Sequence, residues 1–324
     1  MIKIRYKVVA MLTLALGIVG CAQAEPPRLI ETCTAVPRPA YFPQLSPNGK
    51  SIAYSSVDGF KLMMRMLDTD SVITVDSIGA PGYDARFGGD GLLYYITMER
   101  KRNNLVYRTA HSFDVVTGSH HVVLPAQHGA VRLCPTTDGM AIAGEHKNYV
   151  VGKGKWVYTE NSKLIIVDGK HRTTVSPAGQ CAGYIWASLS PDGNKVVFDA
   201  VGKGLYVCDL NGKVLAKLGY YLMPQWLDND YVVAMLSSAN NTTVKKQQLV
   251  ALRADGRGSR VALTEPDEDA TYPMVGADGR LVYVGKNVET RLARVTRDPV
   301  TAEEKESEPA VRPQRGRSYH VDVD

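Results

Sequence analysis

The chain of 324 residues holds few side chains that could do chemistry together, and histidines are the first to consider. Imidazoles gathered at one point could bind a metal ion. The histidines in the body of the chain are His111, His120, His121, His128, His146 and His171. His120 and His121 are adjacent in a β-prone segment, where neighbouring side chains point to opposite sides of a strand, so both cannot bind one ion. We expect only His128 near a binding surface, and we predict no metal site.

Sequence motifs of known catalytic chemistry are also missing. The chain has no G-x-S-x-G elbow of a serine hydrolase and no H-E-x-x-H zinc motif. It has neither G-x-x-x-x-G-K-[ST] nor G-x-G-x-x-G, which would indicate nucleotide binding. The sequence therefore predicts no catalytic residue and no cofactor, and it favours a protein that is not an enzyme.

Six copies of one pattern organise the chain: a short apolar strand, a turn, and a second strand of alternating apolar residues. The clearest copies are PQLSPNGKSIAYSS around Ser46 and ASLSPDGNKVVFDA around Ser190. Pro fixes φ in such a turn, Asp or Asn bonds the nearby backbone, and Gly supplies a positive φ, so each copy predicts a hairpin. The turn positions are Gly49, Gly91, Gly139, Gly193, Asp230 and Gly279, spaced by 37 to 54 residues with a mean of 46.

A period of this length is typical of a four-stranded propeller blade. We predict an all-β, six-bladed β-propeller with four-stranded blades over residues 25–300. An irregular β-sandwich is the alternative, but it would not give a constant period. Residues 28–36, RLIETCTAV, are β-prone and have no hairpin of their own, while the last copy becomes polar and proline-broken after residues 291–295. We expect 28–36 to be the missing outer strand of the last blade, which closes the ring.

Positions at fixed distances before each turn predict where a propeller of this kind would bind. Seven residues before it stand Phe42, Asp84, Arg132, Trp186, Met223 and Tyr272, and five before it stand Gln44, Arg86, Cys134, Ser188, Gln225 and Met274. Four before it are apolar residues or proline that we expect to pack between blades: Leu45, Phe87, Pro135, Leu189, Trp226 and Val275.

Aromatic and charged residues of these kinds anchor interfaces and stack on sugars. We predict a binding surface at the mouth of the central channel, formed by Tyr41, Phe42, Tyr83, Asp84, Arg86, His128, Arg132, Tyr184, Trp186, Tyr221, Gln225 and Tyr272. Packing between blades is the alternative role for the aromatic members. A structural ion pair with an arginine is the alternative for Asp84.

Residues 1–24 are typical of an export signal, with three cations ahead of an apolar stretch. Residues 18–21, IVGC, have the form of a lipobox in which Cys21 becomes lipid-modified, whereas Ala22-Gln23-Ala24 fits ordinary signal peptidase. We favour the lipoprotein interpretation, and expect an outer-membrane lipoprotein or a periplasmic protein of the cell envelope that touches the membrane only through a lipid anchor. Loss of the three cations lowers the formal charge from +5 to about +2, so nucleic acid is not an expected partner.

Four cysteines, Cys33, Cys134, Cys181 and Cys208, remain after either cleavage. In an oxidising compartment they could form disulfides, and the alternative is that they are small buried residues of strands. Residues 301–324 carry charges of both signs and no apolar face, which predicts a disordered tail.

The SPNGKSIAYSS and SPDGNKVVFDA copies, with their weaker relatives, resemble the TolB-like, WD40-like β-propeller repeat family. The resemblance covers about residues 41–295, and so the propeller without the family's N-terminal domain. It implies a non-enzymatic envelope module for protein–protein interaction or scaffolding, with a Pal-like or other outer-membrane protein as partner. A glycan-binding or carbohydrate-active, lyase-like propeller is the alternative function, and a subunit of a larger envelope machine is a third.

Overall fold

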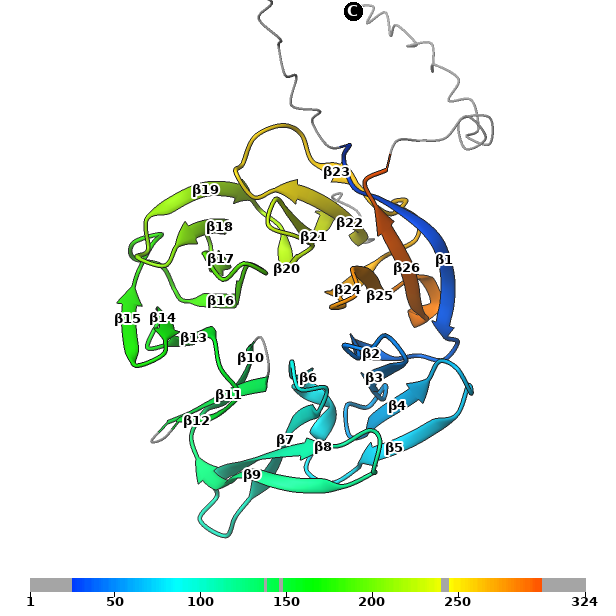
Figure 1. The fold of residues 1–324 in the computed structure, drawn as a ribbon, viewed down its shortest axis with the longest axis vertical. Coiled ribbons are helices and arrows are strands. Elements are labelled where there is room, and N and C mark those ends of the chain that lie inside the picture. The colour runs from blue at the N-terminus through cyan, green and yellow to red at the C-terminus, as the bar shows by residue number, and fades with distance from the viewer. Residues whose placement is uncertain (1–24, 137–138, 146–147, 240–244, 299–324) are drawn as a thin grey trace, which may run out of the picture. The chain divides into compact units, whose positions relative to one another are not determined.

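Seven antiparallel β-sheets surround a central channel in the computed structural model of the protein (Figure 1). The structure describes residues 25–136, 139–145, 148–239 and 245–298. Residues Pro27–Thr296 form one compact unit, and in each sheet of this unit the first strand of the meander lies innermost. The predicted all-β propeller is confirmed, but the prediction of six blades is wrong, because the ring has seven.

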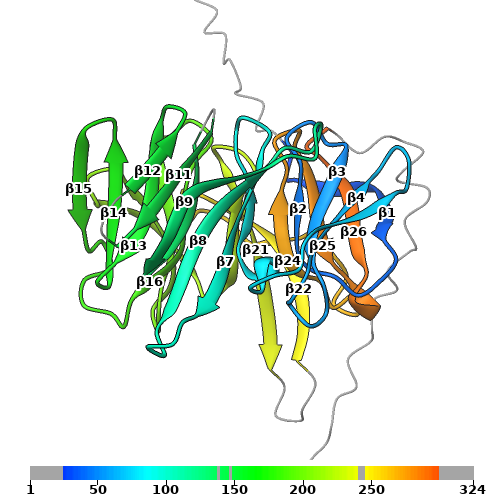
Figure 2. The same ribbon diagram turned by 90° about the horizontal axis from the view of Figure 1, so that it is seen from below.

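Four blades are meanders of four consecutive strands. Blade 1 consists of β2 (Tyr41–Leu45), β3 (Ser51–Ser55), β4 (Leu62–Met66) and β5 (Val72–Asp76). Blade 2 follows the short 3-10 helix η1 (Pro81–Tyr83) and consists of β6 (Ala85–Phe87), β7 (Leu93–Arg100), β8 (Val106–Phe113) and β9 (His120–His128). Blade 5 consists of β16 (Tyr184–Leu189), β17 (Lys195–Ala200), β18 (Gly204–Asp209) and β19 (Val214–Gly219). Blade 6 consists of β20 (Leu222–Trp226), β21 (Tyr231–Ala239), β22 (Lys245–Arg253) and β23 (Val261–Ala262), and its β21–β22 pair extends beyond the other blades (Figure 2).

Blades 3 and 4 show three strands each within the described residues. Blade 3 consists of β10 (Val131–Thr136), β11 (Gly139–Gly144) and β12 (Asn148–Val151), and blade 4 of β13 (Lys155–Glu160), β14 (Lys163–Asp168) and β15 (His171–Val175). Blade 7 consists of β24 (Thr271–Val275), β25 (Arg280–Val284) and β26 (Thr290–Thr296), with the 3-10 helix η2 (Lys286–Val288) between the last two, and of β1 (Arg28–Val36). The blades are therefore mostly, but not uniformly, four-stranded.

The additional blade lies in the longest interval of the repeat, the 54 residues between Gly139 and Gly193. Residues 155–175 form a blade of their own, blade 4, between the third and fourth copies of the repeat. The β13–β14 hairpin turns through Asn161 and Ser162, whose φ values are 48° and 56°. Glycine or asparagine usually occupies such left-handed positions. Because serine takes one of them here, the turn has no Asp-Gly signal, and two short blades occupy what reads as one long repeat.

The strand β1 closes the ring, as predicted for residues 28–36. It pairs antiparallel with β26, from Arg28 opposite Thr296 to Val36 opposite Thr290. Its last residues, Ala35 and Val36, are buried between blades 1 and 7. The first strand of the chain therefore completes the last blade, and the outer edge of β26 is paired.

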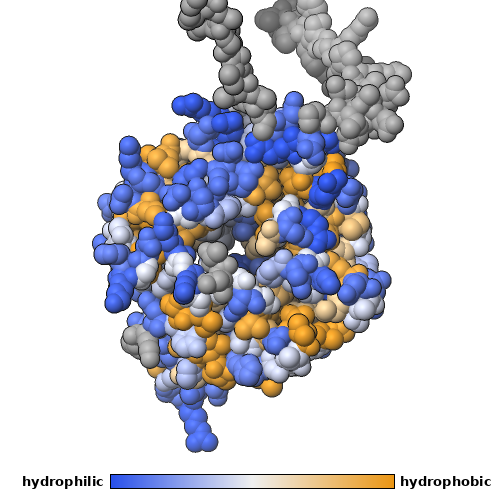
Figure 3. Space-filling model, viewed as in Figure 1, coloured by the Kyte–Doolittle hydropathy of each residue, from blue (hydrophilic) through white to orange (hydrophobic). Residues whose placement is uncertain are grey.

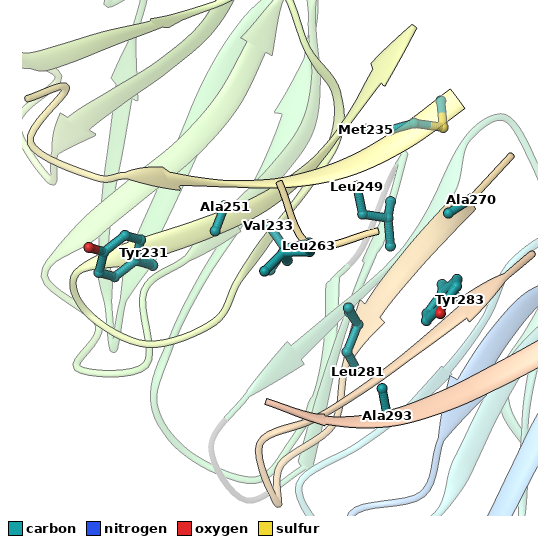
Figure 4. Packing of buried hydrophobic residues seen from close by; sticks show 10 residues of the cluster. All are labelled: Tyr231, Val233, Met235, Leu249, Ala251, Leu263, Ala270, Leu281, Tyr283 and Ala293. Atoms are coloured by element: carbon teal, nitrogen blue, oxygen red, sulfur yellow. The ribbon is translucent and has the colours of Figure 1, made fainter. Parts of the chain in front are cut away.

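The core consists of side chains packed between neighbouring blades. Successive residues of a strand point to opposite faces, so Ile52 and Tyr54 pack toward Val282 of blade 7, while Ala53 packs toward Phe87 of blade 2. Figure 4 shows the cluster between blades 6 and 7, to which Tyr231, Val233, Leu281 and Tyr283 contribute. Five of the six positions that were predicted to pack between blades do so, and Pro135 instead is exposed and lines the central channel.

The four cysteines of the described chain are free. Cys134 and Cys208 are buried in strands, and burial raises the pKa of each thiol to about 12. The small-residue interpretation therefore describes these two, while Cys33 is exposed. The predicted signal, with Cys21, and the predicted tail lie outside the described residues. No helix in the described part of the chain is long and apolar enough to cross a membrane.

Candidate functional site: the central channel and one of its mouths

Four of the innermost strands are bulged at the position seven residues before the turn. Phe42, Trp186, Met223 and Tyr272 have φ values of 51° to 52°, in a left-handed region that bulky residues rarely adopt. Pairing is interrupted at each of them: Tyr41 is opposite Ser55, but the next pair is Gln44 with Ala53. The same shift occurs in β16, β20 and β24. Bulges of this kind redirect the following side chains.

The side chains two residues beyond each bulge line one cavity in the channel. All six positions five before the turn contribute to it: Gln44, Arg86, Cys134, Ser188, Gln225 and Met274. Blade 4, which the sequence did not reveal, contributes Lys155 and Val157. The cavity has a volume of about 720 Å³, and its opening is the hollow at the centre of the ring in Figure 3.

Several polar groups of this lining have no partner among the described residues. Gln44 is only 5% exposed, yet its side chain makes no hydrogen bond to any described residue. The Oγ of Ser188 is buried and without a partner in the described chain. Arg86 forms neither a hydrogen bond nor an ion pair with a described residue. Of these three groups, Ser188 Oγ is the buried atom, while the polar atoms of Gln44 and Arg86 are accessible from the channel. The channel is therefore a candidate binding site, because these groups are available to a ligand.

The charged side chains around the cavity differ in whether they already have hydrogen-bond or ion-pair partners. The Nζ of Lys155 donates to the carbonyl of Gly193 at 3.3 Å and lies 3.7 Å from Asp168. The carboxylate of Asp192 accepts hydrogen bonds from Ser190 Oγ at 2.6 Å and from the backbone of Asn194 at 3.1 Å, which hold the pKa of Asp192 below its usual value. Among the described charged side chains of the lining, Arg86 is therefore the one without a hydrogen bond or ion pair.

Asp84 lies near Arg86 without bonding to it. Burial raises the pKa of the Asp84 carboxyl, and the positive charge of Arg86 partly opposes this effect. Within the described residues neither Arg86 nor Arg132 forms a hydrogen bond or ion pair with Asp84, so the alternative role in a structural ion pair is not observed. Asp84 and Arg132 are both half-buried and lie outside the cavity lining.

Three of the predicted aromatic residues meet where blades 1 and 7 adjoin. The ring centroids of Phe42 and Tyr272 are 4.7 Å apart, and those of Tyr41 and Tyr272 are 6.0 Å apart, both in edge-to-face geometry. Such pairs stabilise a contact beyond the area they bury. The cluster joins the first and last blades at the bulged ends of β2 and β24.

An exposed apolar patch lies at the same end of blade 1. It consists of Val57 and Phe60 in the β3–β4 turn and Tyr83 in η1, which are 59%, 59% and 56% exposed. The two connections touch, because a Cβ on Gly59 would lie only 2.7 Å from the Cζ of Tyr83. Ser55, which immediately precedes the turn, is opposite Tyr41 in the sheet. The patch therefore adjoins the aromatic cluster.

Local hydrogen bonds hold the β3–β4 turn in one conformation. Ser56 Oγ donates to Asp58 Oδ1 at 2.5 Å, and the same carboxylate accepts from the backbone of Phe60 at 3.0 Å. The backbone of Lys61 donates to Ser56 Oγ at 3.0 Å. The turn at Ser190 uses the same bonds. Val57 and Phe60 are consequently presented on a rigid turn rather than on a flexible loop.

The remaining predicted site residues have different surroundings. Tyr184 is buried in the core of blade 5, where its hydroxyl donates to the carbonyl of Gly179 at 3.1 Å. Tyr221 is half-buried against the cluster between blades 5 and 6. His128 ends β9, the outermost strand of blade 2, and its ring lies against Tyr107. Of the twelve predicted residues, Arg86, Trp186 and Gln225 line the cavity.

Two other histidines bond to residues of β7. His111 Nε2 lies 2.9 Å from Thr97 Oγ1, and His120 Nδ1 lies 3.0 Å from the hydroxyl of Tyr95. That hydroxyl also donates to Asp76 at 2.9 Å. Among the described residues, no group of three or more His, Cys, Asp or Glu side chains is placed to hold a metal ion.

The binding surface predicted from the sequence omitted Gln44 and Ser188 of the cavity lining, and it omitted the patch residues Val57 and Phe60. Gln44 and Ser188 belong to the set five residues before the turn, so this spacing could have identified them as lining residues. The segment SVDG at 56–59 repeats the Ser-x-Asp-Gly pattern between strands β3 and β4. That repetition could have identified a second rigid turn with apolar residues at its exposed positions.

The buried carboxyl of Asp199, in β17 of blade 5, leads to a prediction about the pH dependence of stability. Its side chain is 7% exposed, lies between Ile185 and Leu205 in the sheet, and makes no hydrogen bond to a described residue. Burial raises the pKa of this carboxyl. A raised pKa means that the folded state holds the proton more tightly, so stability falls as pH rises through the usual range of a carboxyl group toward the raised value.

We expect Asp199→Asn to raise the free energy of unfolding at pH 7 by about 1 kcal/mol, because a neutral amide replaces a carboxylate whose charge is costly to bury. The gain should shrink below pH 4, where aspartate is protonated in both states. Urea denaturation of both proteins at pH 4 and pH 7 measures this difference. Equal midpoints at pH 7 would contradict the prediction.

Comparisons with known proteins bear on the fold. No protein-family model matches the chain, and no curated protein matches it in sequence. A gluconolactonase from Xanthomonas campestris has a similar structure, with a TM-score of 0.50 and 12% identity over 84% of this chain and 95% of the enzyme.

Two other solved structures are similar at a lower TM-score of 0.45. TolB from Acinetobacter baumannii is 13% identical over 80% of this chain, which spans 56% of the TolB chain. Hydrazine synthase from Kuenenia stuttgartiensis is 15% identical over 78% of this chain and 74% of its own. At these identities the likeness is one of fold, and the chain is a β-propeller that resembles propellers of different function.

Proposed function

We propose that the protein is a non-enzymatic binding module of the cell envelope that docks another protein at the patch formed by Val57, Phe60 and Tyr83. The observation that supports this proposal most is the exposure of three large side chains from two connections in contact with each other. Exposed apolar groups that adjoin in this way are typical of protein–protein interfaces. Aromatic side chains are enriched among the residues that dominate binding energy.

The rigidity of the turn supports the same proposal. The bonds of Ser56 and Asp58 hold the backbone of the turn that carries Val57 and Phe60 before a partner arrives. Less conformational entropy is then lost on binding, so a small patch can reach useful affinity. The partner that fits is a protein with an apolar groove or loop, and a TolB-like role would make it a Pal-like or other outer-membrane protein.

The proposed cellular location is consistent with this function. The lipobox-like residues 18–21 favour lipidation of Cys21 and attachment to the outer membrane, with the propeller in the periplasm. An anchored propeller would meet membrane-bound partners at high local concentration. Glycan binding is the alternative, and it would be expected to use the faces of Tyr41, Phe42 and Tyr272, which here contact one another edge to face.

A photo-crosslinking amino acid at Tyr83, in the full chain with its signal, tests the docking surface. We expect one envelope protein to be crosslinked in intact cells, and Phe60→Asp to reduce its yield about tenfold or more, as for a central interface residue. Val116→Asp is the matched control, because Val116 is 91% exposed in the β8–β9 turn, away from the patch.

The two variants separate the outcomes. Unchanged crosslinking in Phe60→Asp, or equal loss in Val116→Asp, would contradict docking at the patch. Capture of glycan without protein would favour the alternative. The same experiment with Cys21→Ala tests the anchor, since a lipoprotein should lose membrane attachment and most of the crosslink.

A further inference from the structure

We infer that the central channel binds a small molecule through a carboxylate group, held by Arg86 together with Gln44, Ser188 and Gln225. This site is separate from the docking patch and does not depend on the proposed function. All four residues line the 720 Å³ cavity and come from blades 1, 2, 5 and 6. The inference starts from their unused hydrogen-bonding capacity.

The amide of Gln44 is the strongest indication. The residue is 95% buried, its side chain borders the cavity, and it makes no hydrogen bond within the described residues. Gln225 and Arg86 likewise make none there, and Ser188 Oγ is buried without a partner. Arg86 and Gln225 are half-buried and keep their polar atoms available, whereas the buried Ser188 Oγ costs free energy as long as it has no partner. A ligand in the cavity would have these groups as its available polar contacts.

The chemistry of the unpartnered groups selects an anion. A guanidinium offers only donors in a planar fork that matches a carboxylate, and glutamine amides and a serine hydroxyl add further donors. Among the described residues of the lining, the acidic side chain is that of Asp192, which is already bonded to Ser190 and Asn194. Lys155 adds a second positive charge to the lining, and its Nζ lies 3.7 Å from Asp168. The two cationic side chains therefore favour an anion, although the charge of Asp84 acts on Arg86 and the glutamine and serine oxygens can also accept hydrogen bonds.

The volume and the walls of the cavity indicate the size of the ligand. Cavities of about 300–1,000 Å³ hold small molecules, and this one falls within that range. Leu45, Phe87, Leu133, Val157 and Met274 form its apolar walls. A ligand with a carboxylate on an otherwise uncharged body of sugar or dipeptide size would place its charge at Arg86 and its body against these walls.

Isothermal titration calorimetry with two matched pairs tests the inference on the full chain. The pairs are N-acetyl-alanyl-alanine with its C-terminal amide, and D-glucuronate with D-glucose. We expect at least one carboxylate to bind, and its uncharged counterpart to bind about tenfold more weakly or worse. Binding by the dipeptide alone would identify a peptide end as the source of the carboxylate, and binding by glucuronate alone an acidic sugar.

Arg86→Gln should weaken the same binding about tenfold or more, since it removes the charge and the fork. Arg102→Gln is the control, because Arg102 is exposed in the β7–β8 hairpin and loses the same charge. Circular dichroism and the urea midpoint of Arg86→Gln check its fold, and Gln225→Leu provides a second variant that keeps the net charge.

Three results would overturn the inference: no binding by either carboxylate at about 10 mM, equal binding within both pairs, or wild-type affinity in Arg86→Gln. None of these involves the patch, so crosslinking at Tyr83 would be unaffected. Loss of the crosslink with intact carboxylate binding would refute the proposed function alone.

Discussion

Replacing Phe198 with alanine is expected to lower the free energy of unfolding by about 3–5 kcal/mol. Phe198 lies in β17 and is fully buried between blades 4 and 5, where Val157 and Leu164 belong to the same cluster. Its ring lies edge to face with Tyr184 at 5.3 Å and is stacked on Tyr206 at 5.9 Å. The substitution therefore removes a large apolar side chain and leaves a cavity that two neighbouring rings cannot fill.

Urea denaturation followed by tryptophan fluorescence and by circular dichroism measures the loss. Val116→Ala serves as the control, because Val116 is 91% exposed and its replacement should change stability by no more than about 0.5 kcal/mol. Where Phe198→Ala fails to fold, Phe198→Leu, with an expected loss of about 1 kcal/mol, keeps the prediction testable. A loss in Phe198→Ala no larger than that in Val116→Ala would show that blades 4 and 5 do not pack as described.

The fold could be predicted from sequence where its signals are local. The turns at Gly49 and Gly193 depend on residues within five positions of each other, and the structure shows the bonds that those residue types imply. The closing strand at 28–36 could also be predicted, because a β-prone segment without a hairpin must pair elsewhere. The number of blades could not, because Asn161 and Ser162 make a turn without glycine.

The site was partly predictable for a related reason. The spacing from the turn grouped the six residues five before it, since equivalent positions of every blade face the same way around a ring, but the predicted binding surface included only Arg86 and Gln225 of them. The bulges at Phe42, Met223 and Tyr272 were not predicted, although each precedes a proline, which in a strand interior often marks a bulge. The cavity itself depends on the number of blades, which sets the width of the channel, and on Val157 from the unrecognised blade.

Removing residues 25–36 is expected to cost more than about 5 kcal/mol, the largest effect among these predictions. The deletion removes the backbone hydrogen bonds between β1 and β26, each contributing about 1 kcal/mol. It also exposes the surfaces covered by Ala35 and Val36, at about 1–3 kcal/mol for a buried aliphatic side chain. The edge of β26 would be left unpaired and available for association between chains. Size-exclusion chromatography and urea denaturation measure both consequences.

A circular permutant tests whether the pairing of β1 with β26 stabilises the ring, because it keeps this pairing while it moves the chain termini. Thr296 and Arg28 are opposite each other in the β1–β26 pair, so a short linker can join the two strands as a hairpin. New termini then fall in the connection 37–40 between β1 and β2. We expect this permutant to keep most of the stability of the full chain, because β1 still pairs with β26, and to lose it when Val36→Asp is added. If the permutant were as unstable as the deletion, or the deletion as stable as the full chain, closure by β1 would not be what stabilises the ring.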